Sequence, residues 1–349
     1  MTSAASMKPF HDLTRALPLP AQWPRTTVAQ RYDDLRDWHR TRQAAETRAL
    51  RLLALVDGAL DDTMLDAARA RGIAWQSLYP DTMLEASRPE IGPFLLDLTA
   101  DDDASRTTMF DLLNAGSDSD LVVWLATGHA LPVLAAYLHP LAEATLPDTR
   151  QALLRYYDPS ILENLVPILT PAQRRELLAT FVELRYRFDP WESIVGEEKG
   201  QLPAGAATPI VFTEAQYDAL AHEGFAETLY FRLRDEFLPP MSAVPDRWGI
   251  RYMKDLVARA RSRHGLVNEN DLAYFALIGM NVHPAFDAHP AIAEKIAARG
   301  AAPPPMSSTL ADVDADVWAA LLDTHPLAGY AGESRDAEAA AADASPDAG

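Results

Sequence analysis

Residues 153–169 read LLRYYDPSILENLVPIL, with two tyrosines, an arginine, an aspartate and a proline between two apolar runs. The first five residues are apolar or aromatic apart from Arg155, which favours a strand. Asp158 stands directly before Pro159. An aspartate accepts hydrogen bonds from the free N–H groups at a helix start, and proline suits the first helical position because its φ is preset. The stretch therefore predicts a strand followed by a helix that Asp158 caps.

The same stretch also allows a chemical interpretation, in which Arg155, Tyr156, Tyr157 and Asp158 form a reactive cluster. That interpretation requires a neighbour that activates a tyrosine or the aspartate, and the adjoining sequence contains none. We favour the structural interpretation, with Tyr156 and Tyr157 on opposite faces of a strand and Arg155 as a surface or edge charge. Tyr156, Tyr157, Asp158 and Pro159 then form a structural motif.

Short apolar runs alternate with helical stretches on both sides of this junction. We expect strands at 50–60, 74–79, 93–99, 121–127 and 153–157, and helices at 61–72, 105–116, 130–146 and 170–185. The run LVVWLAT at 121–127 is uncharged, as in strands buried on both faces. Because strands alternate with helices, the pattern predicts a mixed α/β lobe with at least part of its sheet parallel.

The remaining segments define the domain organisation. Leu35 and Trp38 lie at helical spacing in a charged segment, which predicts an amphipathic helix. Residues 196–209 are rich in Gly, Pro and Ala, and no apolar run typical of a strand follows them. We expect an N-terminal arm and amphipathic helix at 1–49, an α/β lobe at 50–195, a linker at 196–209, a helical lobe at 210–330 and a disordered acidic tail at 331–349. The predicted fold is a mixed α/β N-terminal lobe followed by a mostly α-helical C-terminal lobe.

Composition and charge exclude several classes of function. The chain has 349 residues, 48% of them hydrophobic, and no cysteine, which excludes disulfides, zinc–thiolate sites and thiol nucleophiles. A net charge of −19 disfavours nucleic-acid binding. The N-terminal residues lack the pattern of a signal peptide, and no apolar run reaches the roughly 18 residues that a membrane span requires. We therefore expect a cytoplasmic protein that contacts neither membrane nor nucleic acid.

Candidate chemical sites are few. His283, Asp287 and His289 could bind a metal, but Pro follows each histidine, so we favour chain-bending positions at helix ends. Residues 312–317 (DVDADV) resemble the start of a calcium loop but lack its glycine, so we favour acids in the first turns of a helix. The sequence contains no phosphate-binding loop, GxSxG or HExxH motif. We expect no catalytic residue, metal or cofactor.

One predicted helix carries a candidate surface for a protein partner. In 247–263, four basic residues share one side, beside a stripe formed by Ile250, Met253, Val257 and Ala260. The four are Arg247, Arg251, Lys254 and Arg261. A basic stripe beside a buried one could receive an acidic partner. The alternatives are a solvated face or a pairing with the acidic segment 309–325.

Four short motifs in the first half of the chain resemble those of a known family. They are Asp57-Gly58-Ala59, Ser77-Leu78-Tyr79, Gly92-Pro93-Phe94-Leu95 and Tyr156-Tyr157-Asp158-Pro159. In order and spacing, over about residues 50–185, the chain resembles the type VI secretion effector chaperones, also called effector adaptors. One departure is that residues 114–138 contain no Arg or Lys, although a basic or polar turn is common there.

The resemblance implies a protein without catalytic activity. Members of that family bind a cognate toxin effector in the cytoplasm and help to load it onto the spike protein VgrG, so these two proteins are the expected partners. The alternative is a metal- or Asp/His-dependent hydrolase of unknown substrate, and a third possibility is a scaffold without a client. A deep polar pocket with two or more histidines would favour the hydrolase, and a broad apolar groove would favour the adaptor.

Overall fold

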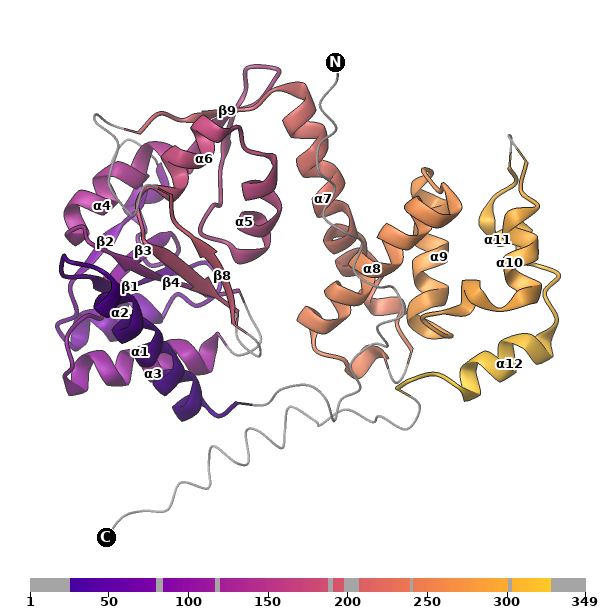
Figure 1. Cartoon of the computed structure of the whole chain (residues 1–349), viewed down its shortest axis with the longest axis horizontal. Coiled ribbons are helices and arrows are strands. Elements are labelled where there is room, and N and C mark those ends of the chain that lie inside the picture. The colour runs from indigo at the N-terminus through magenta and orange to yellow at the C-terminus, as the bar shows by residue number, and fades with distance from the viewer. Residues whose placement is uncertain are drawn as a thin grey trace, which may run out of the picture. The chain divides into compact units, whose positions relative to one another are not determined.

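The computed structural model describes residues 26–79, 84–116, 120–187, 191–197, 207–238, 241–300 and 303–327. The chain divides into two compact units, Pro24–Phe225 and a second that begins at Ala226 (Figure 1). The first is a mixed α/β unit and the second is helical, as the sequence predicts. No helix of the described part is both long and apolar enough to cross a membrane.

The first unit contains a six-stranded sheet, a three-stranded sheet and the helices between them. In chain order its elements are α1 Val28–Ala45, β1 Arg51–Asp57, α2 Met64–Ala70, β2 Trp75–Ser77, β3 Pro93–Asp97, α3 Asp103–Ala115, β4 Val122–Thr127, α4 Leu131–Leu138, β5 Glu143–Thr145, β6 Gln151–Leu153, α5 Pro159–Leu165, α6 Pro171–Leu178, β7 Glu183–Tyr186, β8 Glu192–Val195, β9 Ile210–Val211 and the beginning of α7 Glu214–Leu233. Leu35 and Trp38 are buried on α1, which confirms the predicted stripe.

The large sheet has the strand order β2-β3-β1-β4-β7-β8, and each of its pairs is antiparallel. The prediction of a partly parallel sheet is therefore wrong for this sheet. β1 and β2, which α2 connects, do run parallel to each other, but they do not pair. β3 lies between them and runs antiparallel to both. β3 and β4 are likewise separated by β1. Two interleaved crossovers of this kind give a split β-α-β arrangement.

Alternate residues of the sheet face two helical layers. Leu52 and Ala54 of β1 belong to a core with α1, α2 and α3, whereas Leu53 and Leu55 belong to a core with α4, α5 and α6. Figure 1 shows the sheet between these layers. Both faces of β1 and β4 are buried, as predicted for the run 121–127.

Two predicted helices are too long. The predicted helix 130–146 ends at Leu138, and β5 follows; the predicted helix 170–185 ends at Leu178, and β7 follows. β7 pairs with β4, and this pairing overrides the helical propensity of its local sequence. In the three-stranded sheet, β5 pairs in parallel with β9 and antiparallel with β6.

The boundary between the units lies within α7. Because β9 pairs with β5, the chain after the predicted linker 196–209 returns to the first unit, which extends to Phe225. Residues 198–206 of that linker, the arm 1–25 and the tail 331–349 lie outside the described residues.

The second unit consists of short packed helices. After the end of α7 come α8 Asp246–His264, α9 Glu269–Asn281, the 3-10 turn η7 Phe286–Ala288, α10 Pro290–Ala297, α11 Met306–Thr309 and α12 Ala315–Asp323. Two glycines allow close approach: a Cβ on Gly249 would lie 2.4 Å from the Tyr230 ring, and one on Gly279 would lie 2.3 Å from Leu256. Gly265 ends α8 in a left-handed conformation with φ of +63°.

Candidate functional site

The four motifs of the sequence analysis meet at one end of the large sheet. β1 ends at Asp57, β2 ends at Ser77 and β3 begins at Pro93. The chain after β6 brings Arg155 to the same end, where its guanidinium contacts Asp57. Segments up to 98 residues apart in the sequence thus form one cluster, which we call the motif cluster.

Glycines bring the backbones of this cluster together. The N–H of Gly58 donates to the carbonyl of Gly92 over 3.1 Å. A Cβ on Gly58 would lie 2.2 Å from the Glu90 carbonyl oxygen, and one on Gly92 would lie 2.8 Å from the Tyr79 ring. These distances leave no room for a side chain, which is the physical reason for glycine at both positions.

A buried carboxylate is the electrostatic centre of the motif cluster. The side chain of Asp57 is 2% exposed and accepts hydrogen bonds from Arg155 Nη2 at 2.7 Å and from the Ala59 N–H at 3.1 Å. Arg155 is 43% exposed and also lies 3.2 Å from Asp158. Burial opposes the charge of Arg155, but the hydrogen bond to Asp57 and the nearby carboxylates raise its pKa. The guanidinium is therefore a fixed cation that joins β1 to the start of α5.

Asp158 caps α5 as predicted. Its side chain accepts from the N–H of Ser160 at 2.9 Å, and Pro159 occupies the first helical position. Burial raises the pKa of Asp158. The prediction that Arg155 is a surface or edge charge misses its pairing with Asp57, which no local pattern indicates.

The two tyrosines occupy a buried turn, because β6 ends at Leu153. The prediction that they lie on opposite faces of a strand is therefore wrong, and both belong to the core beneath α4 and α5. The Tyr157 hydroxyl lies 3.2 Å from that of Tyr79, and the Tyr156 hydroxyl donates to the Leu138 carbonyl. Burial raises the pKa of both Tyr156 and Tyr157, so both hydroxyls stay protonated.

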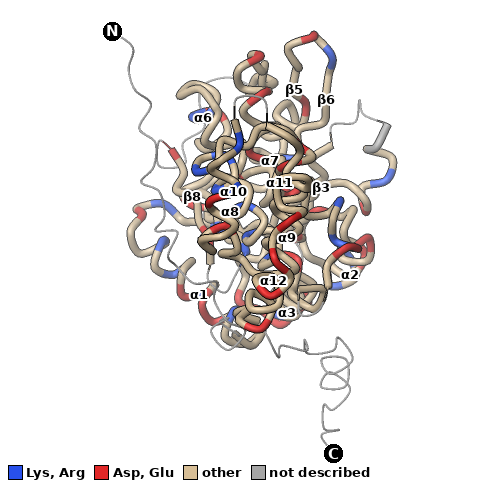
Figure 2. Tube along the Cα trace, turned by 90° about the vertical axis from the view of Figure 1, so that its right-hand side faces the viewer, with Lys and Arg blue, Asp and Glu red and all other residues tan. Residues whose placement is uncertain are grey.

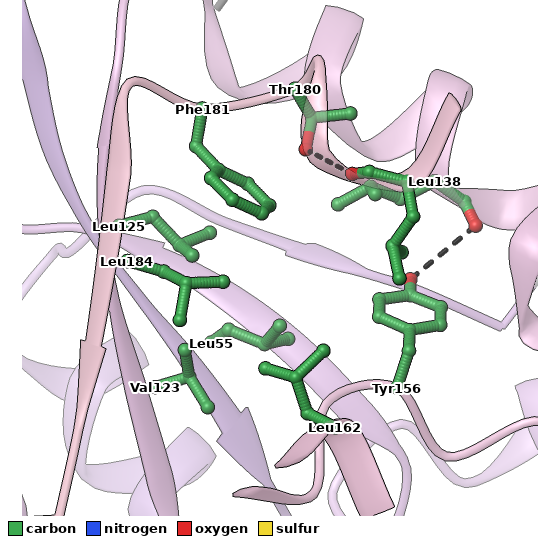
Figure 3. Close-up of a pocket in the computed structure, with 10 residues that line it drawn as sticks. Leu55, Val123, Leu125, Leu138, Tyr156, Leu162, Thr180, Phe181 and Leu184 are labelled. Carbon is green, nitrogen blue, oxygen red and sulfur yellow. Dashed lines mark hydrogen bonds between the residues drawn. The ribbon is translucent and has the colours of Figure 1, made fainter. Parts of the chain in front are cut away.

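A small apolar cavity lies beside Tyr156 (Figure 3). Its volume is about 10 Å³. It is lined by Leu55, Val123, Leu125, Leu138, Tyr156, Leu162, Leu177, Thr180, Phe181 and Leu184. The Thr180 and Tyr156 hydroxyls both donate to backbone carbonyls and not into the cavity. This cavity is a gap in a packed core, too small for a substrate and without a histidine.

The predicted basic stripe lies on α8, where Figure 2 colours Lys and Arg blue. Arg251 is exposed, whereas Arg247, Lys254 and Arg261 are half-buried. The guanidinium groups of Arg247 and Arg251 lie 5.1 and 5.9 Å from the Trp248 ring centre. Met253, Val257 and Ala260 are buried as expected, and the buried face also includes Trp248, Tyr252 and Leu256. The role of this stripe in partner binding stays a prediction.

The acids weighed as metal ligands have other partners. Asp287 is 1% exposed and lies 2.8 Å from His264 and 3.2 Å from Arg259. His289 precedes α10 as its N-terminal flanking residue. In the calcium-like stretch, Asp314 caps α12 and Asp312 pairs with Lys295. Among the residues that the structure describes, no group of three or more His, Asp or Glu is arranged to hold a metal ion.

Comparison with known proteins gives a match to a family model. Residues 52–176, which are 125 of the 349 residues, match the model of a protein family described as a domain of unknown function (DUF4123). No curated protein and no solved structure matches the chain. The matched segment begins in β1 and ends in α6, so it contains the whole motif cluster.

Proposed function

We propose that this protein is a type VI secretion effector chaperone, or adaptor, which binds a cognate toxin effector in the cytoplasm and loads it onto the VgrG spike. The observation that carries the proposal is the motif cluster. The four motifs by which the sequence resembles that family are distant in the chain and meet at one end of the sheet. They all lie within the matched segment 52–176.

The chemistry of the motif cluster supports a binding protein over an enzyme. Asp57 is neutralised by Arg155, Asp158 is engaged as a helix cap, and burial keeps the hydroxyls of Tyr156 and Tyr157 protonated. None of these groups is poised as a nucleophile or general base. The cavity beside Tyr156 is apolar and holds no acid–base pair of the kind a hydrolase uses. We therefore assign the motif cluster a structural role in the adaptor fold.

The proposal is tested by co-expression with a candidate toxin taken from the genes that neighbour this protein's own. We expect the toxin to be soluble, to co-purify with this protein, and to be secreted only when it is present. Co-purification of VgrG with the pair would support the loading step. A toxin that is equally soluble and equally secreted without this protein would sink the proposal.

The α8 stripe is our candidate for the surface that receives the effector. A double charge reversal, Arg251→Glu with Lys254→Glu, should weaken effector capture in a pull-down because it replaces two cations by two anions. Arg232→Glu is the matched control, since Arg232 is an exposed cation on another helix. Unchanged capture by the double variant would remove α8 from the interface and leave the adaptor function itself untouched.

A further inference from the structure

Two His-Pro turns in the second unit share one hydrogen-bond pattern. In His283-Pro284-Ala285, Nδ1 of His283 accepts the backbone N–H of Ala285 over 3.0 Å. In His325-Pro326-Leu327, Nδ1 of His325 accepts the backbone N–H of Leu327 over 3.0 Å. In each turn the ring therefore holds the backbone two residues ahead, as an Asx turn does with a side-chain oxygen.

The two turns pack against each other. Their imidazole rings are 6.2 Å apart between centres and nearly perpendicular, at 83°. The first turn follows α9, and the second follows α12, the yellow helix of Figure 1. His325 is 5% exposed, and the turn it makes buries Leu327. The ring pair thus fastens the last described segment of the chain to the end of α9.

Both hydrogen bonds require an unprotonated Nδ1. A protonated imidazole carries N–H groups on both nitrogens, so it can no longer accept from the backbone. Two protonated rings at this separation would also repel each other.

The surrounding charges do not offset this repulsion. Arg259 of α8, which donates to the Pro284 carbonyl, adds a third cation. Asp287 of η7 is already paired with Arg259 and His264 and lies 3.9 Å from Arg263. Asp323, in the last turn of α12, is exposed to solvent.

We propose that the two His-Pro turns form a proton-operated clasp, which holds α12 and the chain to Leu327 against α9 at neutral pH and releases them on acidification. The direction of the effect follows from the ring pKa values. Burial lowers the pKa of His325 from 6.5 to about 4, and His283 adds to the shift; burial and Arg259 lower the pKa of His283. The open form binds protons first, so the clasp is at full strength above pH 6.5 and weakens as the pH falls toward 4.

Hydrogen exchange of the full chain measures the opening directly. For the His325 ring alone, a pKa of 6.5 in the open form and about 4 in the closed form makes the opening equilibrium at pH 5 about 30 times that at pH 7.5. We expect the protection factors of amides 315–327, corrected for intrinsic exchange, to fall by up to about this factor. Amides of α8 should keep their protection.

The decisive variant is His283→Asn with His325→Asn. Asparagine can accept the N–H two residues ahead, as Asn268 does from Asn270 over 2.9 Å, but it does not titrate. We expect protection of 315–327 in this variant to change less than about twofold between the two pH values. His289→Asn is the matched control, because Nδ1 of His289 accepts no hydrogen bond from any residue that the structure describes. This variant should behave as the unaltered chain.

Equal acid sensitivity in the double variant and the unaltered chain would overturn the clasp. A second measurement covers the case in which the double variant does not fold. In the unaltered chain, NMR should show His325 as a neutral ring with unprotonated Nδ1 and a pKa well below 6.5. A His325 ring that titrates at 6.5 or above would also overturn the proposal.

Discussion

The two units use a buried aspartate in different ways. In the first, Asp57 meets Arg155, whose side chain is nearly half exposed, at a place where glycine backbones are in contact. In the second, Asp287 lies among Arg259, His264 and Arg263, and the first two of these are only 11% exposed. A cation that reaches water can relax when its partner is removed, and an enclosed one cannot. The comparison predicts that the second unit depends more on its aspartate.

The largest effect is expected for Asp287→Ala. This change takes away the carboxylate that lies 3.2 Å from the buried Arg259 cation, and it should lower the free energy of unfolding by about 3–5 kcal/mol. Urea unfolding followed by circular dichroism measures it. Asp312→Ala is the control, since its solvent-exposed pair with Lys295 should contribute little to the free energy of unfolding. Equal losses for both variants would show that Asp287 is not a structural centre.

Arg155→Leu is expected to have the next largest effect. It leaves the Asp57 carboxylate buried with the Ala59 N–H as its remaining described hydrogen-bond donor, which should cost about 2–3 kcal/mol. Asp57→Asn should lower the free energy of unfolding by less, because the partly exposed Arg155 side chain can be solvated once its partner is gone. Arg150→Leu, at an exposed pair with Asp148, is the control with an effect under about 1 kcal/mol. If Asp57→Asn lowered the free energy of unfolding more than Arg155→Leu, the proposed difference between the two units would be wrong.

Gly249→Ala should destabilise the second unit by about 1–3 kcal/mol. Its new Cβ would meet the Tyr230 ring at 2.4 Å, and this ring is held by the hydrogen bond from its hydroxyl to Asp246 at 2.9 Å. The melting temperature of the variant measures the effect. A double variant with Tyr230→Leu should recover part of the loss, and no recovery would mean that the contact is not the cause.

The smallest effect, and one of opposite sign, is expected for Gly224→Ala. Gly224 lies inside α7, and a Cβ there would meet no described atom within 4 Å beyond its chain neighbours and the backbone of its own helix. Alanine should therefore stabilise the chain by about 0.5–1 kcal/mol through its helix propensity. Gly72→Ala, at φ of +76°, is the matched control and should destabilise. A loss of stability in Gly224→Ala would show that glycine is needed there for another reason.

Local signals predicted the local features of both units. The cap at Asp158, the helix α1 with its buried Leu35 and Trp38, and the helix α8 follow from residues within a few positions of each other. Local signals could not predict that the strands of the large sheet are antiparallel. That arrangement arises because β3 inserts between β1 and β2, and β3 follows its partner β1 by about 40 residues. β7 was missed for the same reason: its partner β4 lies about 60 residues earlier.

The candidate site shows the same limit. The four motifs can be recognised in the sequence, but the contact between Asp57 and Arg155 cannot. These residues are 98 positions apart, and no periodic pattern in the sequence links them. Nor does any pattern indicate that the Tyr79 and Tyr157 hydroxyls meet. The sequence predicted a chain bend at His283, and its ring-to-backbone hydrogen bond became visible only in the folded chain. No pattern in the sequence indicated the matching turn at His325.

The place of β1 in the sheet has a consequence for folding during synthesis. β1 is made before the other strands that the structure describes, yet it lies between β3 and β4. Leu95 of β3 and Val123 of β4 pair with Leu55 and follow it by about 40 and 70 residues. Its apolar side chains stay unpaired on the ribosome until both partners have emerged. Non-local pairing of this kind slows folding and exposes the nascent chain to aggregation. A nascent chain stopped before Thr127 should therefore stay protease-sensitive, and one extended past Val195, with β7 and β8 added, should gain protection.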